Sequence, residues 1–141
     1  MFRMPLPMPT AKNLKQHKKN KIIEFSMSLY KFANKSVIYL ARIEPIRPIY
    51  KYGISRDIYK RILNGHIKTF PIFQMEHIIE TRHREDAEDI LTNELKLRGI
   101  HHIEKFNGKM NRELIILNND GEELQEVKEL MENIVDHLHK S

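Results

Sequence analysis

The stretch that decides the fold runs from residue 37 to residue 55 and reads VIYLARIEPIRPIYKYGIS. Residues 37–43 are mostly β-branched, aromatic or apolar, a composition that is typical of a β-strand. Pro45 and Pro48 predict a loop, because two prolines do not both fit inside a central strand. Residues 49–54 have strand composition again, so the whole stretch predicts a β-hairpin.

Outward from the hairpin, the chain alternates helices and strands. Ser55 or Asp57 is placed to cap a helix that runs to about residue 63, and the pair Asn64-Gly65 is expected to stop it. The other predicted elements are strands at residues 72–81 and 113–117 and helices at residues 84–98 and 122–139. The order β-β-α-β-α-β-α predicts an α/β (α+β) domain with a small sheet flanked by helices.

The length of 141 residues predicts one domain with an appended segment. We expect a basic N-terminal extension at residues 1–35 that is partly disordered, with a short helix at 22–32. A domain at residues 36–118 follows, and then a C-terminal helix at residues 119–141 that packs on the domain. No apolar run reaches the ~18 residues of a membrane span, and we find no secretion signal and no cysteine. These features predict an intracellular protein, in the cytoplasm or nucleus, that is not secreted and has no membrane partner.

Positive charge is concentrated in the N-terminal half of the chain. Residues 1–35 hold eight Lys and Arg against one acid, residues 36–75 seven against two, and residues 76–141 nine against sixteen. Basic segments bind nucleic acid because their phosphate contacts release counterions. The lysine run that includes Lys18 and Lys19 is therefore a candidate DNA-binding arm, and the alternative is a solvated tail that only aids solubility.

Three side chains that suit phosphate chemistry are expected to meet near the hairpin. Tyr39 lies on the first strand and Lys51 on the second, so a hairpin allows both to face one surface. Arg61 follows on the next helix, together with the candidate DNA-binding residues Arg56 and Lys60. A phenol, an amine and a guanidinium on one face form an anion-binding patch that includes a proton acceptor.

The order and spacing of these residues resemble the GIY-YIG nuclease superfamily, which is named for its two tripeptides. The matching positions are Val37-Ile38-Tyr39, the stretch Lys51-Tyr52-Gly53-Ile54-Ser55, then Arg61 and His66, and the later stretch Asn111-Arg112-Glu113-Leu114. The resemblance covers residues 36–118 and is closest to a phage- and virus-type DNA-binding branch whose second tripeptide reads Lys-Ile-Gly. In this chain Val37 replaces the first glycine and Lys51 replaces the second tyrosine.

This resemblance implies a three-stranded antiparallel sheet flanked by helices, and hydrolysis of DNA phosphodiesters in a viral or phage setting. It implies that Tyr39 is, or assists, a general base, and that Arg61 neutralises charge on the phosphate in the transition state. Lys51 and His66 join them as catalytic candidates, Lys51 because an amine with a lowered pKa can take a proton. The resemblance also implies one divalent metal ion, Mg²⁺ or Mn²⁺, on a glutamate of the later helix.

The metal ligand is where the sequence departs from the family pattern. Aligning residues 86–87 with the family's helix puts Leu91, and no acid, at the ligand position. Glu88 and Glu94 each lie three residues from Leu91, so either can substitute if the helix is shifted or rotated. If neither carboxylate reaches the site, the domain binds DNA without cutting it.

Three classes of function remain open at this point. The first is a metal-dependent DNA endonuclease, the second a catalytically silent DNA-binding module, and the third a protein–protein interaction module whose motif matches are accidental. Retention of Tyr39 and Arg61 favours the enzyme, whereas the missing metal glutamate favours the silent module. The apolar stripe of the C-terminal helix bears on the third class, because it either covers the sheet or pairs two subunits as a homodimer.

Overall fold

The computed structural model describes residues 30–118 and 121–140 and has an α+β fold. Five strands form one antiparallel sheet in the order β3-β1-β2-β5-β4. The strands are β1 (Val37–Arg42), β2 (Ile49–Ser55), β3 (Gln74–Glu80), β4 (His101–Phe106) and β5 (Lys109–Ile116). The helical segments are the 3₁₀ turn η1 (Tyr30–Phe32), α2 (Ile58–Arg61), the π-helix η2 (Ile62–His66), α3 (Ile67–Thr69), α4 (Arg84–Leu97) and α5 (Glu122–Lys140).

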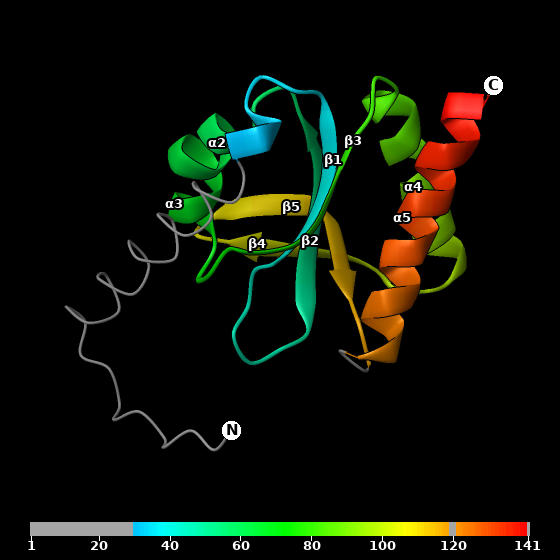
Figure 1. The fold of residues 1–141 in the computed structure, drawn as a ribbon. Coiled ribbons are helices and arrows are strands. Elements are labelled where there is room, and N and C mark those ends of the chain that lie inside the picture. Colours follow the sequence, from blue (N-terminus) through cyan, green and yellow to red (C-terminus); the bar gives the residue numbers. More distant parts are fainter. Residues whose placement is uncertain (1–29, 119–120, 141) are drawn as a thin grey trace, which may run out of the picture.

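The sheet lies between two helical layers, with α2 and α3 on one face and α4 and α5 on the other (Figure 1). Side chains alternate along a strand, so β1 contributes to two separate cores. Ile38 and Leu40 are buried with α4 and α5, whereas Tyr39 and Ala41 are buried on the side of α2. The predicted class, a sheet flanked by helices, is confirmed.

The β1–β2 hairpin forms where the sequence predicts it. Tyr39 pairs with Gly53 and Ala41 with Lys51, which puts the Tyr39 and Lys51 side chains on the same face of the sheet. The predicted strand at 72–81 and the helices at 84–98 and 122–139 also form, with bounds within two residues of those expected. The hairpin is therefore the frame on which the candidate site is built.

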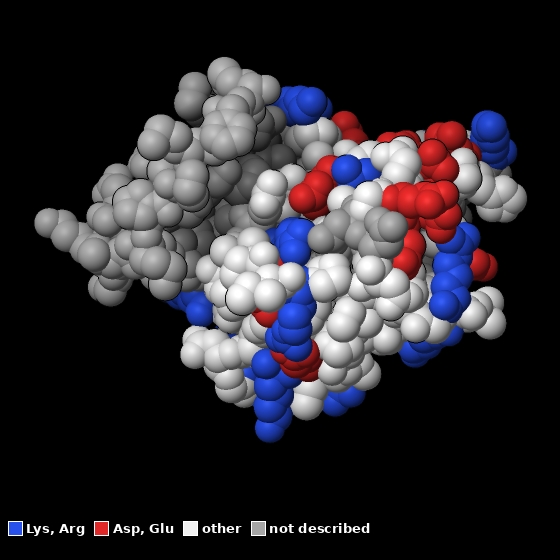
Figure 2. All heavy atoms as spheres, turned by 90° about the horizontal axis from the view of Figure 1, so that it is seen from below, with Lys and Arg blue, Asp and Glu red and all other residues white. Residues whose placement is uncertain are grey.

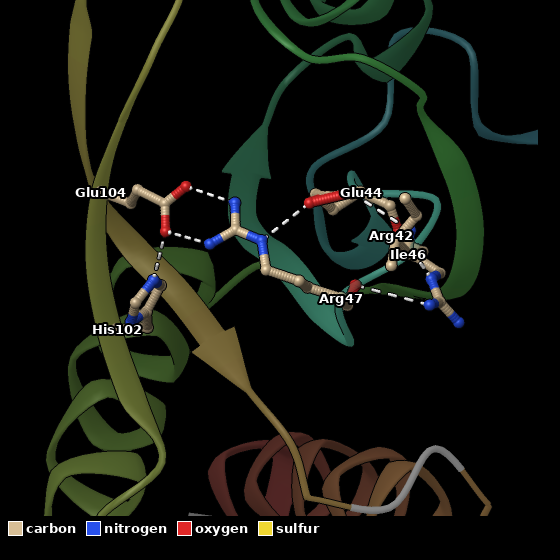
Figure 3. A network of polar contacts seen from close by, with 6 residues as sticks. All are labelled: Arg42, Glu44, Ile46, Arg47, His102 and Glu104. Carbon is tan, nitrogen blue, oxygen red and sulfur yellow. Dashed lines mark hydrogen bonds and ion pairs between the residues drawn. The ribbon is translucent and has the colours of Figure 1, made fainter.

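The loop between β1 and β2 is tied to the edge strand β4 by Arg47 (Figure 3). The Arg47 guanidinium donates to Glu44 Oε2 at 2.8 Å and to both Glu104 oxygens at 2.9 and 2.6 Å. His102 Nε2 lies 2.9 Å from Glu104 Oε1, and the hydrogen bond from Arg47 is the main cause of the lowered pKa of Glu104. A two-pronged guanidinium–carboxylate contact fixes geometry as well as charge, so the loop is held rigidly at this end of the sheet.

The prediction of one late strand is wrong, because residues 101–106 form the additional strand β4 and β5 begins at Lys109 instead of Glu113. The sheet accordingly has five strands where the resemblance implies three. Asn107 and Gly108 have φ values of 49° and 76°, the left-handed backbone of a tight hairpin turn between β4 and β5. The Asn-Gly pair was the local signal for this hairpin.

The predicted helix stop at Asn64-Gly65 is also wrong. The helix widens into the π-turn η2 and continues through α3 to Thr69. Gly65 lies inside this π-turn, and the position would also accept a larger residue, since a Cβ added there would meet no atom within 4 Å. A π-turn shifts the helix register by one residue, and such turns are frequent at functional sites. Here the shifted register ends at His66, whose side chain is buried.

The apolar stripe of helix α5 packs against other elements of the same chain. Val127, Met131, Ile134 and Val135 are buried, and α5 contacts α4 and β3. This packing supports the interpretation that the stripe covers the sheet. On the face shown in Figure 2, the acidic side chains that can be seen lie mainly in the right-hand half, the side on which α5 lies in Figure 1.

The basic N-terminal extension lies mostly outside the described residues. Of the helix expected at 22–32, the structure describes only the 3₁₀ turn η1, and Lys18 and Lys19 are not described. Among the described helices, none is both long and apolar enough to span a bilayer.

Candidate active site

The structure brings the predicted catalytic residues together on the α2 side of the sheet. Tyr39 comes from β1, Lys51 from β2, Arg61 from the end of α2 and His66 from the end of η2. Tyr39 Oη lies 2.5 Å from His66 Nε2, and this contact joins the sheet to the π-turn. The π-turn explains the contact, because a straight α-helix that stopped at Asn64 would leave His66 in a loop.

The Tyr39 ring passes directly over Gly53 on the neighbouring strand. A Cβ added to Gly53 would lie 2.7 Å from Tyr39 Oη and 2.9 Å from Cζ. Glycine is therefore needed at this position for close approach of a side chain, and not for an unusual backbone angle. Gly53 on β2 thus makes room for Tyr39 on β1.

Replacing Gly53 with alanine is expected to destabilise the protein by ~1–3 kcal/mol, because the fully buried Tyr39 ring has no space to move away. The measurement is urea unfolding. Gly65→Ala is the matched control, since its added methyl group meets open space. Equal stability of the two variants would contradict this account of Gly53.

The charged groups around Tyr39 have opposing effects on the pKa of its phenol. Burial raises the pKa of Tyr39 well above its usual value, and the Arg61 guanidinium offsets part of that rise. The carboxylates of Glu88 and Glu113 add to the rise in the pKa of Tyr39. Tyr39 is therefore a protonated phenol at neutral pH, and its proton is available to His66.

His66 is held as a neutral imidazole. Burial lowers its pKa to about 3, and the positive charges of Lys51 and Arg61 contribute to the shift. Its ring stacks on Phe73 with centroids 4.8 Å apart and lies 5.6 Å from Phe70. When the Tyr39 hydroxyl donates to Nε2, the ring proton of His66 sits on Nδ1.

This burial predicts a pH-dependent stability with a definite sign. Between pH 6.5 and about 3 the unfolded chain binds a proton at residue 66 that the folded chain does not bind. The stabilising contribution of neutral His66 is therefore complete above pH 6.5. As the pH falls from 6.5 to about 3, the free energy of unfolding decreases by up to ~1.4 kcal/mol per pH unit because of His66. Urea unfolding over this range should show a shallower loss for His66→Gln, and equal slopes would contradict the prediction.

Lys51 is buried beside a carboxylate that sequence reasoning did not select. Its Nζ lies 3.1 Å from Glu113 Oε2. Burial lowers the pKa of Lys51, while Glu113 and then Glu88 oppose that change. The strands β2 and β5 pair only from Ile49 to Lys51, so Glu113 reaches the ammonium group where the two strands part. Glu113 belongs to the stretch Asn111-Arg112-Glu113-Leu114 of the resemblance, but strand alternation alone does not predict its contact with Lys51, because Lys51 pairs with the neighbouring Leu114.

Of the two candidate metal glutamates, Glu88 is the one whose charge acts on the pKa values of Tyr39 and Lys51, although α4 covers the other face of the sheet. Burial raises the pKa of Glu88, Glu113 adds to the rise, and Lys51 opposes it. Glu94 is not among the groups with the largest effects on the pKa values of Tyr39, Lys51 and Glu88. Leu91, the position favoured by simple alignment, is fully buried in the core beneath α4 and cannot hold an ion.

The residues present fit a metal ion that has one protein ligand. In the described ranges, no three His, Cys, Asp or Glu side chains gather as a metal-binding group. Mg²⁺ is commonly held by one or two carboxylates together with substrate phosphate oxygens. A carboxylate whose pKa is raised by burial and by Glu113 gains from a neighbouring cation, so Glu88 is the residue that would hold it.

The predicted DNA-binding residues in α2 and just before it line an open groove of about 560 Å³ beside the site. Arg56 and Lys60 contribute to its wall, and Arg61 and His66 belong to both the groove and the catalytic group. The groove thus connects the buried Tyr39–His66 pair with solvent-exposed cations.

Comparisons of the chain with protein-family models, with curated proteins and with solved structures find no match.

Proposed function

We propose that this chain is a divalent-metal-dependent endonuclease of the GIY-YIG type, which hydrolyses DNA phosphodiesters inside the cell. The observation that carries the proposal is the convergence of Tyr39, His66, Lys51 and Arg61 from four separate elements beside a cationic groove. Burying a lysine and a histidine together costs desolvation free energy and does not stabilise a fold. We therefore attribute their position to a chemical role.

Tyr39 and His66 are suited to move a proton together. The phenol can accept a proton from an attacking water while passing its own proton to His66 Nε2, 2.5 Å away. The lowered pKa of His66 opposes that transfer in the free protein. A bound phosphate adds negative charge near the ring, which favours the imidazolium and so assists the transfer when substrate is present.

Arg61 and Lys51 supply positive charge at the phosphate. Arg61 is solvent-exposed and borders the groove, so it is placed to contact a phosphodiester and to stabilise the charge that develops on it. Lys51 is oriented by Glu113, whose carboxylate holds the ammonium group at 3.1 Å. A divalent ion on Glu88, when bound, would supply Lewis-acid stabilisation of the leaving oxygen.

The test is incubation of the purified protein with supercoiled plasmid in Mg²⁺ or Mn²⁺, with EDTA as the control. Nicking that requires the metal ion supports the proposal. Absence of nicking in both metals, from protein that is folded, would overturn it.

The second candidate is a DNA-binding module that does not cut. The burial of Tyr39, which has no exposed surface in the described structure, favours this function because a general base must reach its water. The same plasmid experiment separates the two functions. A salt-sensitive shift in DNA mobility without nicking would support the binding module.

A further inference from the structure

We propose that the groove beside the site binds the DNA backbone next to the phosphodiester at Arg61, and that Lys109 is the phosphate contact on its far wall. The proposal rests on the proposed function, since it extends the DNA path away from the reactive centre. Lys109 follows the β4–β5 turn and lies some fifty residues along the chain from the rest of the groove, so only the fold brings it there.

The β4–β5 hairpin tip is fixed against the helical side of the groove by two contacts. Asn107 Nδ2 donates to the backbone oxygen of Lys68 at 3.0 Å. Phe106 meets Phe70 edge to face, with ring centroids 5.4 Å apart. In Figure 1 this end of β4 and β5 lies beside α3. These contacts hold the hairpin tip beside α3, and Lys109, which follows the tip, lines the groove together with residues of α2.

The groove carries a strong excess of positive charge. Arg56, Lys60, Arg61 and Lys109 line it, against one acid, Asp57. The Asp57 carboxylate is engaged locally, because its Oδ1 accepts from the backbone N–H of Lys60 at 3.3 Å and caps α2. In the part of the chain that the structure describes, none of the four cations forms an ion pair with a carboxylate.

Unpaired cations around an open groove favour a ligand with several phosphates over a single small anion. The polar side chains of Ser55, Asn64 and Thr69 also line the groove and can donate hydrogen bonds to phosphate oxygens. Because Arg61, His66 and Lys109 all line the groove, a strand with its reactive phosphate at Arg61 would also pass Lys109. A DNA backbone meets these requirements, as its charges repeat at regular intervals.

The test measures binding of a short fluorescent DNA duplex by anisotropy, in EDTA and over a series of salt concentrations. Lys109→Gln is compared with Lys105→Gln, which removes the same charge from the same hairpin but outside the groove. Lys109→Gln should weaken binding about fivefold and reduce the slope of log affinity against log salt by about one, as expected for one lost phosphate contact. Lys105→Gln should stay within about twofold of the wild-type affinity at every salt concentration.

The outcomes separate this inference from the proposed function. Equal effects of the two substitutions on a wild-type protein that binds DNA would overturn the role of Lys109 and leave the endonuclease proposal standing. Failure of the wild-type protein to bind DNA at low salt would overturn both. Tighter binding of a matched RNA duplex, lost on Lys109→Gln, would overturn the assignment of DNA as the ligand.

Discussion

Replacing Arg61 with alanine is expected to reduce DNA cleavage by ~10²–10³-fold while weakening DNA binding by less than about tenfold. The guanidinium borders the groove and offsets part of the burial-induced rise in the pKa of Tyr39. Its loss therefore removes charge stabilisation at the phosphate and also makes the phenol harder to ionise. Both effects act on the chemical step, whereas binding retains the other groove cations.

Arg56→Ala is the control for this prediction, because it removes the same charge from the same groove. Arg56 is not among the groups with the largest effects on the pKa of Tyr39. At saturating protein its single-turnover cleavage rate should stay within about threefold of wild type. Equal loss of cleavage in the two variants at saturation would show that Arg61 acts only as one more cation.

Glu88→Gln is expected to lower metal-dependent cleavage by ~10²-fold or more, whereas Glu94→Gln should leave it nearly unchanged. The charge of Glu88 acts on the pKa values of Tyr39 and Lys51, and Glu94 is not among the groups with the largest effects on either. Six residues separate the two glutamates on α4, so they project from opposite flanks of its buried stripe. The measurement is the cleavage rate as a function of Mg²⁺ concentration.

Glutamine at position 88 is a suitable probe because it should not harm the fold. Burial and Glu113 already disfavour a charge at this position, so the neutral amide removes an unfavourable interaction. Thermal unfolding should confirm wild-type stability for Glu88→Gln. Loss of cleavage in Glu94→Gln, with activity kept in Glu88→Gln, would contradict the assignment of the metal ligand.

The sequence predicted those parts of the fold whose signals are local. The β1–β2 hairpin follows from two apolar strands around Pro45 and Pro48, and α5 follows from its apolar period. Strand β4 was missed because it is an edge strand with His, Glu and Lys side chains and no fully apolar run. The π-turn at Ile62–His66 was missed because Asn64-Gly65 is normally a stop signal, and only packing of His66 into the core overrides it.

The sequence predicted the residues of the candidate site but not the contacts between them. Strand alternation placed Tyr39 and Lys51 on one face, as the pairing of β1 with β2 requires. The contact of Tyr39 with His66 depends on the π-turn, and the Lys51–Glu113 pair depends on where β2 and β5 separate. Neither follows from motif spacing, because each joins segments whose relative position is set by tertiary packing.

The most direct test of the account is the nicking of supercoiled plasmid by size-exclusion fractions of the wild-type protein in Mg²⁺, beside the same fractions of Arg61→Ala. We expect nicking to follow the wild-type protein peak, to stop in EDTA and to be ~10²-fold or more weaker in the variant. Nicking of equal rate in both preparations would assign the activity to something other than this site. Bound but uncut plasmid in every wild-type fraction would contradict the claim that the Tyr39, His66, Lys51 and Arg61 group hydrolyses DNA.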